Sequence, residues 1–229
     1  MPEVGGEFVW RMEDVLELYA EPYDPGRPVV CFDEASKELH GEVNPPLPAR
    51  PGEAAREDYE YTREGTANVF LIVEPLAGRR HLTVTERRTR SDFAGQMKYL
   101  RDELYPEAEV IRVVLDNLNT HGPASLYTAF APEEARRLAK RLEFHHTPKH
   151  ASWLNMAELE FSVLARQCLG RRIATREELA RAVAAWEAGR NAVRAKIAWC
   201  FRVADARVKL AGLYPVGPEN SGKTSVSDH

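Results

Sequence analysis

The stretch Pro28-Val-Val-Cys-Phe-Asp-Glu34 decides the fold that we expect for this chain. Its first five residues form an unbroken apolar run, which is typical of a strand buried on both faces of a sheet, and the run ends at Asp33. A second apolar run, at residues 110–115, ends in the same way at Asp116. Strands come first in the chain, and strands and helices then alternate, so the sequence predicts an α/β fold.

The other predicted elements follow from hydrophobic spacing and from turn and capping residues. Ser91 is expected to cap one helix, and Thr175-x-x-Glu178 is a capping box that opens another. We expect further strands at 37–43, 66–73, 81–85 and 142–145. The expected helices are 8–19, 91–104, 132–142, 153–169 and 176–196, followed by a final amphipathic segment that ends at residue 213. Loops are expected at 44–52 and 117–131. The expected organisation is an N-terminal helix and linker (1–27), one main domain with C-terminal helices (28–214) and a disordered tail (215–229).

Composition limits the class of protein. With 229 residues, of which 44% are hydrophobic, the chain can form one sizeable globular domain. It has no apolar run of membrane-spanning length and no signal-peptide pattern, so we expect no membrane contact and a cytoplasmic location. Three widely spaced cysteines without a Cys-x-x-Cys pair predict neither a disulfide framework nor a zinc site.

Charge is distributed unevenly along the chain. The net charge is −4, which by itself argues against a nucleic-acid-binding protein. Residues 162–211, however, hold eleven Arg and Lys against four acids, a local charge of +7. Such a segment either contacts phosphates or is a solvated helical face, and the sequence leaves both interpretations open.

A third acidic residue completes a pattern. Glu158 lies at the end of His146-Thr-Pro-Lys-His-Ala-Ser-Trp-Leu-Asn-Met-Ala-Glu158, at the start of a predicted helix. One Asp after a strand means little, because Asp also terminates strands. Two on neighbouring strands would repel each other unless cations neutralise them. Asp33, Asp116 and Glu158 therefore predict a site for hard divalent cations acting on a phosphodiester.

The motifs that carry these three acids resemble those of a known family. Cys-Phe-Asp33-Glu34, Leu-Asp116-Asn117-x-x-x-His121 and His-x-Pro-Lys-His-x-Ser-Trp-Leu-Asn155-Met-Ala-Glu158 look like the acidic motifs of DDE transposases of bacterial insertion sequences in the mariner superfamily. The resemblance implies a ribonuclease H-like fold, with a five-stranded mixed sheet and helices on both faces. It also implies that Asp33, Asp116 and Glu158 are the catalytic residues and metal ligands.

The activity that the resemblance implies is DNA cleavage and strand transfer at insertion-sequence ends. Two Mg²⁺ (or Mn²⁺) ions would activate a water or a DNA 3′-hydroxyl for in-line attack and stabilise the leaving oxygen. The implied partners are double-stranded DNA, as terminal inverted repeats and target, and a second copy in a homodimer, at the bacterial nucleoid. Another ribonuclease H-like nuclease would share the site, but not the motif that ends at Glu158.

Supporting residues can be weighed against the three acids. Glu34 should point to the opposite face of the strand from Asp33, and we expect Glu34, Asn117 and Asn155 to support the carboxylates. Glu160 is excluded, because two residues along a helix is about 200° of rotation. Expected DNA contacts are Lys149, His150, His121, Arg171 and Arg172, with His121 and His150 alternatively supporting carboxylates. A histidine metal site is disfavoured because Mg²⁺ prefers oxygen, and Trp153 is expected in the core rather than as a base-stacking platform.

Two further features concern the ends of the chain. Gly217-Pro-Glu-Asn-Ser-Gly-Lys-Thr224 matches the phosphate-loop pattern, but a phosphate loop needs a following helix, and we reject this interpretation. The first 27 residues hold no helix-turn-helix pattern, so we expect end recognition to come from a separate polypeptide. The alternative is an idle transposase remnant that binds DNA or dimerises with, and so regulates, a full-length enzyme.

Overall fold

The computed structural model of the chain describes residues 5–44, 49–54 and 59–215. The phosphate-loop-like segment at 217–224, the predicted tail beyond residue 215 and part of the predicted loop at 44–52 lie outside the described residues. Within the described ranges, no helix is long and apolar enough to cross a membrane.

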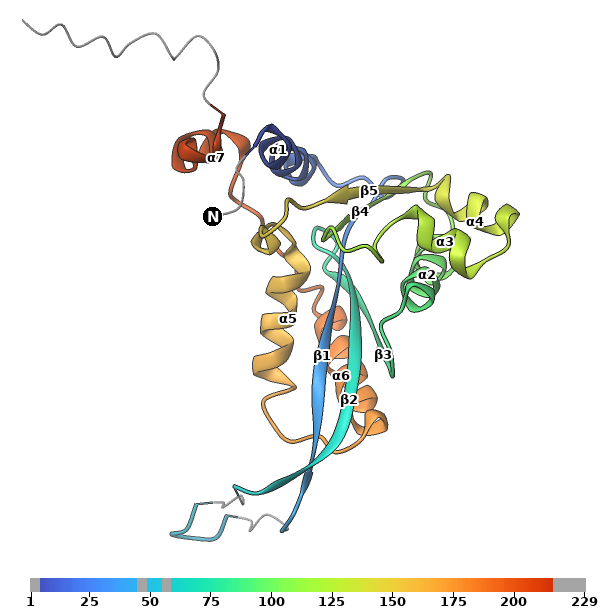
Figure 1. The fold of residues 1–229 in the computed structure, drawn as a ribbon. Helices are drawn as coiled ribbons and strands as arrows, with labels where there is room; N and C mark the ends of the chain where they lie inside the picture. Colours follow the sequence, from blue (N-terminus) through green and yellow to red (C-terminus); the bar gives the residue numbers. More distant parts are fainter. Residues whose placement is uncertain (1–4, 45–48, 55–58, 216–229) are drawn as a thin grey trace, which may run out of the picture.

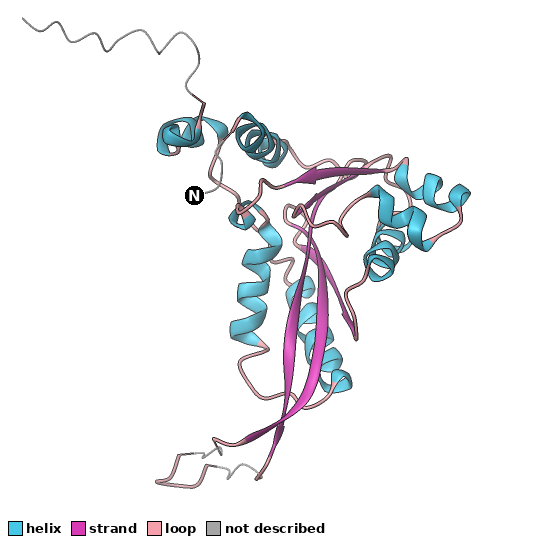
Figure 2. Cartoon of the chain, viewed as in Figure 1, coloured by secondary structure: helices cyan, strands magenta, loops and turns pink. Residues whose placement is uncertain are grey.

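The core of the molecule is one five-stranded mixed sheet, as predicted (Figure 2). The strand order is β3-β2-β1-β4-β5, with β1 (Val29–Glu42), β2 (Tyr61–Glu74), β3 (Arg79–Thr85), β4 (Ile111–Leu115) and β5 (Leu142–His146). β1, β2 and β3 pair antiparallel, whereas β4 and β5 run parallel to β1. The parallel half therefore lies on one side of β1, and the long β1–β2 hairpin extends away from it (Figure 1).

β1 differs from the prediction in one important respect. The strand does not end at Asp33 but continues to Glu42, so the separate strand predicted at 37–43 is the second half of β1. β2 imposes this continuation, because its antiparallel pairing runs from Cys31↔Val73 to Glu42↔Tyr61. What ends near Asp33 is the parallel pairing with β4, whose last pair is Cys31↔Val114. Asp33 therefore faces an open edge of β1 on the β4 side.

Helices cover both faces of the sheet, and two hydrophobic clusters result. One face is covered by α1 (Gly6–Ala20), α5 (Met156–Gln167), α6 (Arg176–Ala192) and α7 (Val203–Lys209). On this face α5 packs on β1 and β2, α6 on β3 and α1 on β5, and α7 packs against α1. On the other face lie α2 (Arg90–Tyr99), the π-helix η1 (Leu100–Leu104), α3 (Pro123–Ala129) and α4 (Pro132–Ala139) (Figure 1). Alternate β1 residues supply the two clusters, since Cys31 belongs to the first and Val30 and Phe32 to the second.

Helix ends follow local capping, and here some predictions were wrong. Thr89 rather than Ser91 caps α2, in a capping box with Asp92. α5 begins at Met156, after the 3₁₀ turn η2 (Ser152–Leu154), and not at 153. The helix α3 lies within residues 117–131, which were predicted to form a loop. Thr175 does cap α6, accepting a hydrogen bond from the Glu178 amide at 3.1 Å.

Candidate active site

Asp33 lies on the β1 face that packs against α5. Its side chain is 9% exposed, and Oδ1 accepts a hydrogen bond from the Glu34 amide at 2.8 Å. The buried apolar residues before it place the carboxylate at the boundary between the sheet core and solvent. A carboxylate in this position needs compensation for the water that it has lost.

Asp116 follows β4 directly, on the strand next to β1. The parallel register pairs Val30 with Val113 and Cys31 with Val114. Continuing this register by two positions brings Asp116 opposite Asp33, and neighbouring strands lie roughly 4.8 Å apart. The two strands therefore deliver these two aspartates to the same end of the parallel pair.

Glu158 is brought to the same region by the first turn of α5. Asn155 caps this helix, because its Oδ1 accepts a hydrogen bond from the Ala157 amide at 3.1 Å. Its Nδ2 donates to the Phe32 carbonyl at 2.9 Å, and Asn155 is 1% exposed. One buried side chain thus joins the start of α5 to the residue before Asp33. This contact sets where the exposed Glu158 stands relative to β1.

The charges of Glu158 and Asp116 both act on Asp33. Burial, the charge of Glu158 and the charge of Asp116 together raise the pKa of Asp33 to about 7, although the Glu34 amide hydrogen bond lowers it. An aspartate with this pKa is half protonated near neutral pH. The site therefore carries negative charge that a cation would relieve.

The donor types in this site fit a hard divalent cation. Carboxylate oxygens are the ligands that Mg²⁺ and Mn²⁺ prefer. The carboxylates are not drawn into a closed cage: across 5–44, 49–54 and 59–215, no three His, Cys, Asp or Glu side chains already lie close enough together to hold a metal ion.

His121 lies beneath the site as a bridge between two acids. Its Nε2 is 2.9 Å from Glu34 Oε2, its Nδ1 contacts Asp116, and its ring stacks on Phe93. Burial lowers the pKa of His121, but the hydrogen bonds to Asp116 and Glu34 outweigh this effect and raise the pKa to about 9. The residue is 4% exposed, which leaves no room for the DNA contact expected of it. The alternative, support of the carboxylates, agrees with this placement.

Glu160 is held far from these acids, on the other side of α5. It is 1% exposed and pairs with Arg80 at 3.0 Å and with Arg190 at 2.8 Å. Arg190 binds both carboxylate oxygens at 2.9 Å in a bidentate arrangement. Glu160 therefore joins α5, α6 and β3. This placement agrees with the prediction from helical rotation that Glu160 lies outside the site.

Comparison with known proteins agrees with this geometry. A family model described as "DDE superfamily endonuclease" matches residues 28–180, which is more than half of the chain. The chain belongs to the DDE superfamily endonucleases. The matched segment contains Asp33, Asp116 and Glu158. A search of curated proteins gave no match.

Solved structures with a similar fold come from the Mos1 transposase. The Mos1 strand transfer complex matches with a TM-score of 0.55 and 14% identity, over 81% of this chain and 55% of that one. A Mos1 paired-end complex with the left transposon end gives 0.55 and 14%, over 81% and 56%. A pre-cleavage Mos1 transpososome gives 0.52 and 14%, over 85% and 65%. The shared feature is the ribonuclease H-like fold, and this chain spans between half and two thirds of the Mos1 chains.

Exposed polar residues surround the Asp116 side of the candidate site. Asp116, Asn117, Lys149 and His150 line one cavity of about 500 Å³. A second cavity, of about 490 Å³, shares the last three of these residues. Lys149 and His150 are exposed, and His150 has a positive φ of 64°, an uncommon conformation for a non-glycine residue. The two cavities adjoin at these shared residues, and we refer to them together as the groove beside Asp116.

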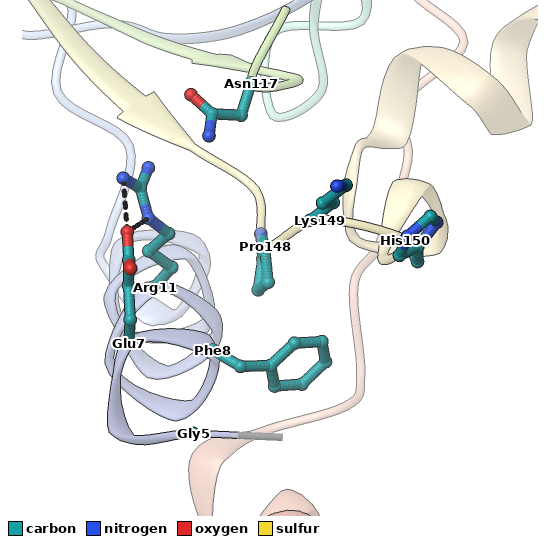
Figure 3. Close-up of a pocket in the computed structure, with 8 residues that line it drawn as sticks. All are labelled: Gly5, Glu7, Phe8, Arg11, Asn117, Pro148, Lys149 and His150. Atoms are coloured by element: carbon teal, nitrogen blue, oxygen red, sulfur yellow. Dashed lines mark hydrogen bonds and ion pairs between the residues drawn. The ribbon is translucent and has the colours of Figure 1, made fainter. Parts of the chain in front are cut away.

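The far wall of this groove is α1, which the sequence did not link to the site. Figure 3 shows Phe8 and Arg11 of α1 facing Pro148 and Asn117 across the second cavity. Arg11 is held by Glu7 at 2.9 Å. The amphipathic spacing of α1 predicted only a packing role, and nothing local to this helix indicated its place beside the groove. The contact between α1 and β5 puts it there.

Two predicted DNA contacts lie elsewhere. Arg171 pairs with Glu178 at 2.7 Å, and Arg172 pairs with Glu42 at 3.1 Å. Glu42 is the last residue of β1, nine residues beyond Asp33, a separation of roughly 30 Å along a strand. The fold therefore does not bring Arg171 and Arg172 to the site.

The Trp153 side chain lies outside the core and packs against two other aromatic rings. It is 42% exposed, its ring stacks with Trp199 at 6.3 Å, and Phe201 meets it edge-on at 5.7 Å. The prediction of a core position was wrong, because the 3₁₀ turn that precedes α5 turns this side chain outward to meet the C-terminal segment.

Proposed function

We propose that this chain is the catalytic domain of a DNA transposase of a bacterial insertion sequence, which cuts the ends of its element and joins them to a target. The observation that carries the proposal is the placement of three acids in one region. The register of β1 and β4 sets Asp33 beside Asp116, and the Asn155 bond to the Phe32 carbonyl sets the start of α5, with Glu158, beside them. The family match and the Mos1-like fold support the same conclusion.

Each acid has a distinct task in this proposal. Asp33 and Asp116 would hold Mg²⁺ or Mn²⁺ from the sheet, and Glu158 would complete the ligand set from α5. The chemistry that a pair of ions supplies, when bound, is activation of water or a 3′-hydroxyl and stabilisation of the leaving oxygen. Asn155 keeps the start of α5 against Phe32, and His121 keeps Asp116 against Glu34. These two residues position ligands and contact no substrate.

The DNA strand would enter the groove beside Asp116. Lys149 and His150 offer a cation and a hydrogen-bond donor for backbone phosphates, and Arg11 and Phe8 offer a second wall. A cavity of about 490 Å³ is of the size that holds a small ligand, so it suits one or two nucleotides of a strand rather than a duplex. Recognition of the terminal repeats by a separate helix-turn-helix polypeptide, and pairing of two copies, belong to this proposal as well.

Metal-dependent nicking tests the proposal directly. The purified chain is incubated with DNA carrying the ends of its own element, with Mg²⁺, with Mn²⁺ or with EDTA. We expect nicking that requires a divalent ion and is lost in Asp116→Ala. The matched control is Glu107→Gln, which removes an exposed acid from the turn before β4 and should cut normally.

Two other outcomes have clear meanings. Cutting that persists in Asp116→Ala would contradict the assigned site. Salt-sensitive DNA binding without cutting by either protein, even with added helix-turn-helix polypeptide, would favour the idle remnant that regulates a full-length enzyme.

A further inference from the structure

Another polar pocket, separate from the groove beside Asp116, lies where the β2–β3 turn meets the end of α6. It has a volume of about 410 Å³ and shares no residue with the cavities around Asp116 and Glu158. Three cationic side chains line it, Arg79, Arg194 and Lys196, together with Tyr23 and Glu74. Nothing in the catalytic proposal uses this pocket.

The walls of the pocket are fixed by backbone contacts. The Ile197 amide donates to the Pro75 carbonyl at 3.1 Å, and Arg80 donates to the Ala195 carbonyl at 2.6 Å. Gly78 has φ +67°, and a Cβ there would lie 2.4 Å from the Arg194 carbonyl oxygen, so only glycine allows this approach. Arg194 itself is held at φ +45°. This left-handed residue ends α6, where the Ala195 amide donates to the Arg190 carbonyl at 3.2 Å, so the helix end holds this wall of the pocket in place.

The cations of this pocket are available to a ligand. Arg194 and Lys196 are exposed, and neither has an ion-pair partner within the part of the chain that the structure describes. Arg79 donates one hydrogen bond, to the Leu104 carbonyl at 3.2 Å. Burial raises the pKa of Tyr23, Glu74 raises it further, and Arg79 and Arg194 lower it, so the charges of all three reach its hydroxyl group. The pocket thus gathers three positive charges against one acid.

That acid, Glu74, points to the kind of anion. It is 3% exposed, and its Oε2 accepts a hydrogen bond from the Tyr105 hydroxyl at 2.8 Å. Its Oε1 has no hydrogen-bond partner among the described residues, although a buried acceptor left unpaired is costly. A ligand that satisfies both features must be an anion that also carries a hydrogen-bond donor.

We propose that this pocket binds inorganic phosphate or a phosphate monoester, with Arg79, Arg194 and Lys196 on its oxygens and Glu74 Oε1 accepting a hydrogen bond from its P–O–H group. Near neutral pH a phosphate monoester retains this proton in part, whereas a phosphodiester and sulfate have none. Arginine and lysine bind all of these anions. Glu74 therefore supplies the preference for phosphate. The ligand is either the 5′-phosphate end of a DNA strand or free phosphate.

Calorimetric titration of the full chain in EDTA tests the site without reference to cutting. We expect inorganic phosphate to bind at least about tenfold more tightly than sulfate at equal ionic strength, the difference that one hydrogen bond to a charged group gives. The double variant Arg194→Gly, Lys196→Ala should lose at least about tenfold in phosphate affinity. Glycine suits φ +45°, so this variant keeps its fold. The double variant Arg136→Ala, Lys140→Ala removes two exposed positive charges at α4 and is the charge-matched control.

Glu74→Gln isolates the role of the carboxylate. Glutamine retains an acceptor for Tyr105, and burial already raises the pKa of Glu74, so a neutral side chain is tolerated there. We expect sulfate and phosphate to bind this variant equally. Equal binding of the two anions to the unmodified chain would overturn the proposal, as would full affinity in the double variant or a retained phosphate preference in Glu74→Gln.

Two oligonucleotides distinguish the sources of the phosphate. If the ligand is a DNA end, a 5′-phosphorylated duplex binds about tenfold more tightly than its 5′-hydroxyl counterpart, and inorganic phosphate competes with it. If the ligand is free phosphate, the two duplexes bind equally while inorganic phosphate still binds. Because metal and catalysis are absent, failure here leaves the transposase proposal untouched, and failure of nicking leaves this site untouched.

Discussion

Replacing Asp33 with asparagine should stabilise the metal-free protein, and the gain should grow with pH. The physical reason is the raised pKa of Asp33, about 7 against an ordinary value of 3.8. A raised carboxylate pKa means that the folded state holds its proton over this interval while the unfolded state has lost it. Stability from Asp33 is therefore present below about pH 4 and is lost as the pH rises towards 7.

The magnitude follows from the difference of about three pKa units. At about 1.4 kcal/mol per unit, Asp33 costs the folded state about 4 kcal/mol near pH 8, where it is ionised, but about 2 kcal/mol near pH 5, where only the unfolded state has lost the proton. Asparagine carries no charge at either pH, and its Oδ1 can still accept the Glu34 amide hydrogen bond. Asp33→Asn should thus gain about 2 kcal/mol more in unfolding free energy near pH 8 than near pH 5.

Urea unfolding followed by tryptophan fluorescence measures this difference, since the chain has four tryptophans. The experiment is done in EDTA at both pH values, with Glu107→Gln as the exposed control, for which we expect no pH-dependent change. Added Mg²⁺ should stabilise the unmodified protein and not Asp33→Asn, and more strongly near pH 8, because a ligand carboxylate must first lose its proton. A gain in stability that is equal at the two pH values would refute the reasoning.

Three further substitutions test how the site is supported. His121→Ala should destabilise the fold by about 2–4 kcal/mol, because the buried Glu34 on β1 loses its partner. It should also raise the Mg²⁺ concentration needed for nicking, because Asp116 is no longer held in place. Unchanged metal dependence would contradict the positioning role of His121. Glu160→Gln should cost about 3–5 kcal/mol in thermal or urea unfolding, because the buried guanidinium of Arg80 is left without a counter-charge. Asn155→Asp keeps the helix cap but not the donor to β1, so we expect nicking to fall at least about tenfold with most of the helix stability retained. Nicking at the unmodified rate would show that this hydrogen bond does not set the position of Glu158.

Much of the fold could be predicted from local sequence patterns. The apolar runs of β1 and β4, and the hydrophobic spacing of α1, α2 and α6, depend on burial and periodicity that are written along the chain. Helical rotation alone separated Glu158 from Glu160, and the structure pairs Glu160 with two arginines. These properties are local, and local sequence determines them.

Other features depended on long-range pairing. The continuation of β1 through its polar residues depends on β2, which lies at least 19 residues further along the chain, and no local pattern indicated it. α3 has seven residues, too few for a clear helical period. The basic segment at 162–211 was open to a phosphate-binding interpretation, yet Arg190 is used in a buried ion pair and Arg171 in a surface one. Charge along a sequence does not say where its partners lie.

The sequence by itself determined which acids we propose as metal ligands, because their motifs follow apolar strands or open a helix. Only the tertiary structure decided which residues hold these acids in place and how much their burial and repulsion reduce the stability of the fold. The Asn155 bond to the Phe32 carbonyl, the burial of His121 between Asp116 and Glu34, and the raised pKa of Asp33 all join segments that are far apart in the chain. Desolvation and charge repulsion depend on distance in space, and that distance is set by the packing of strands and helices.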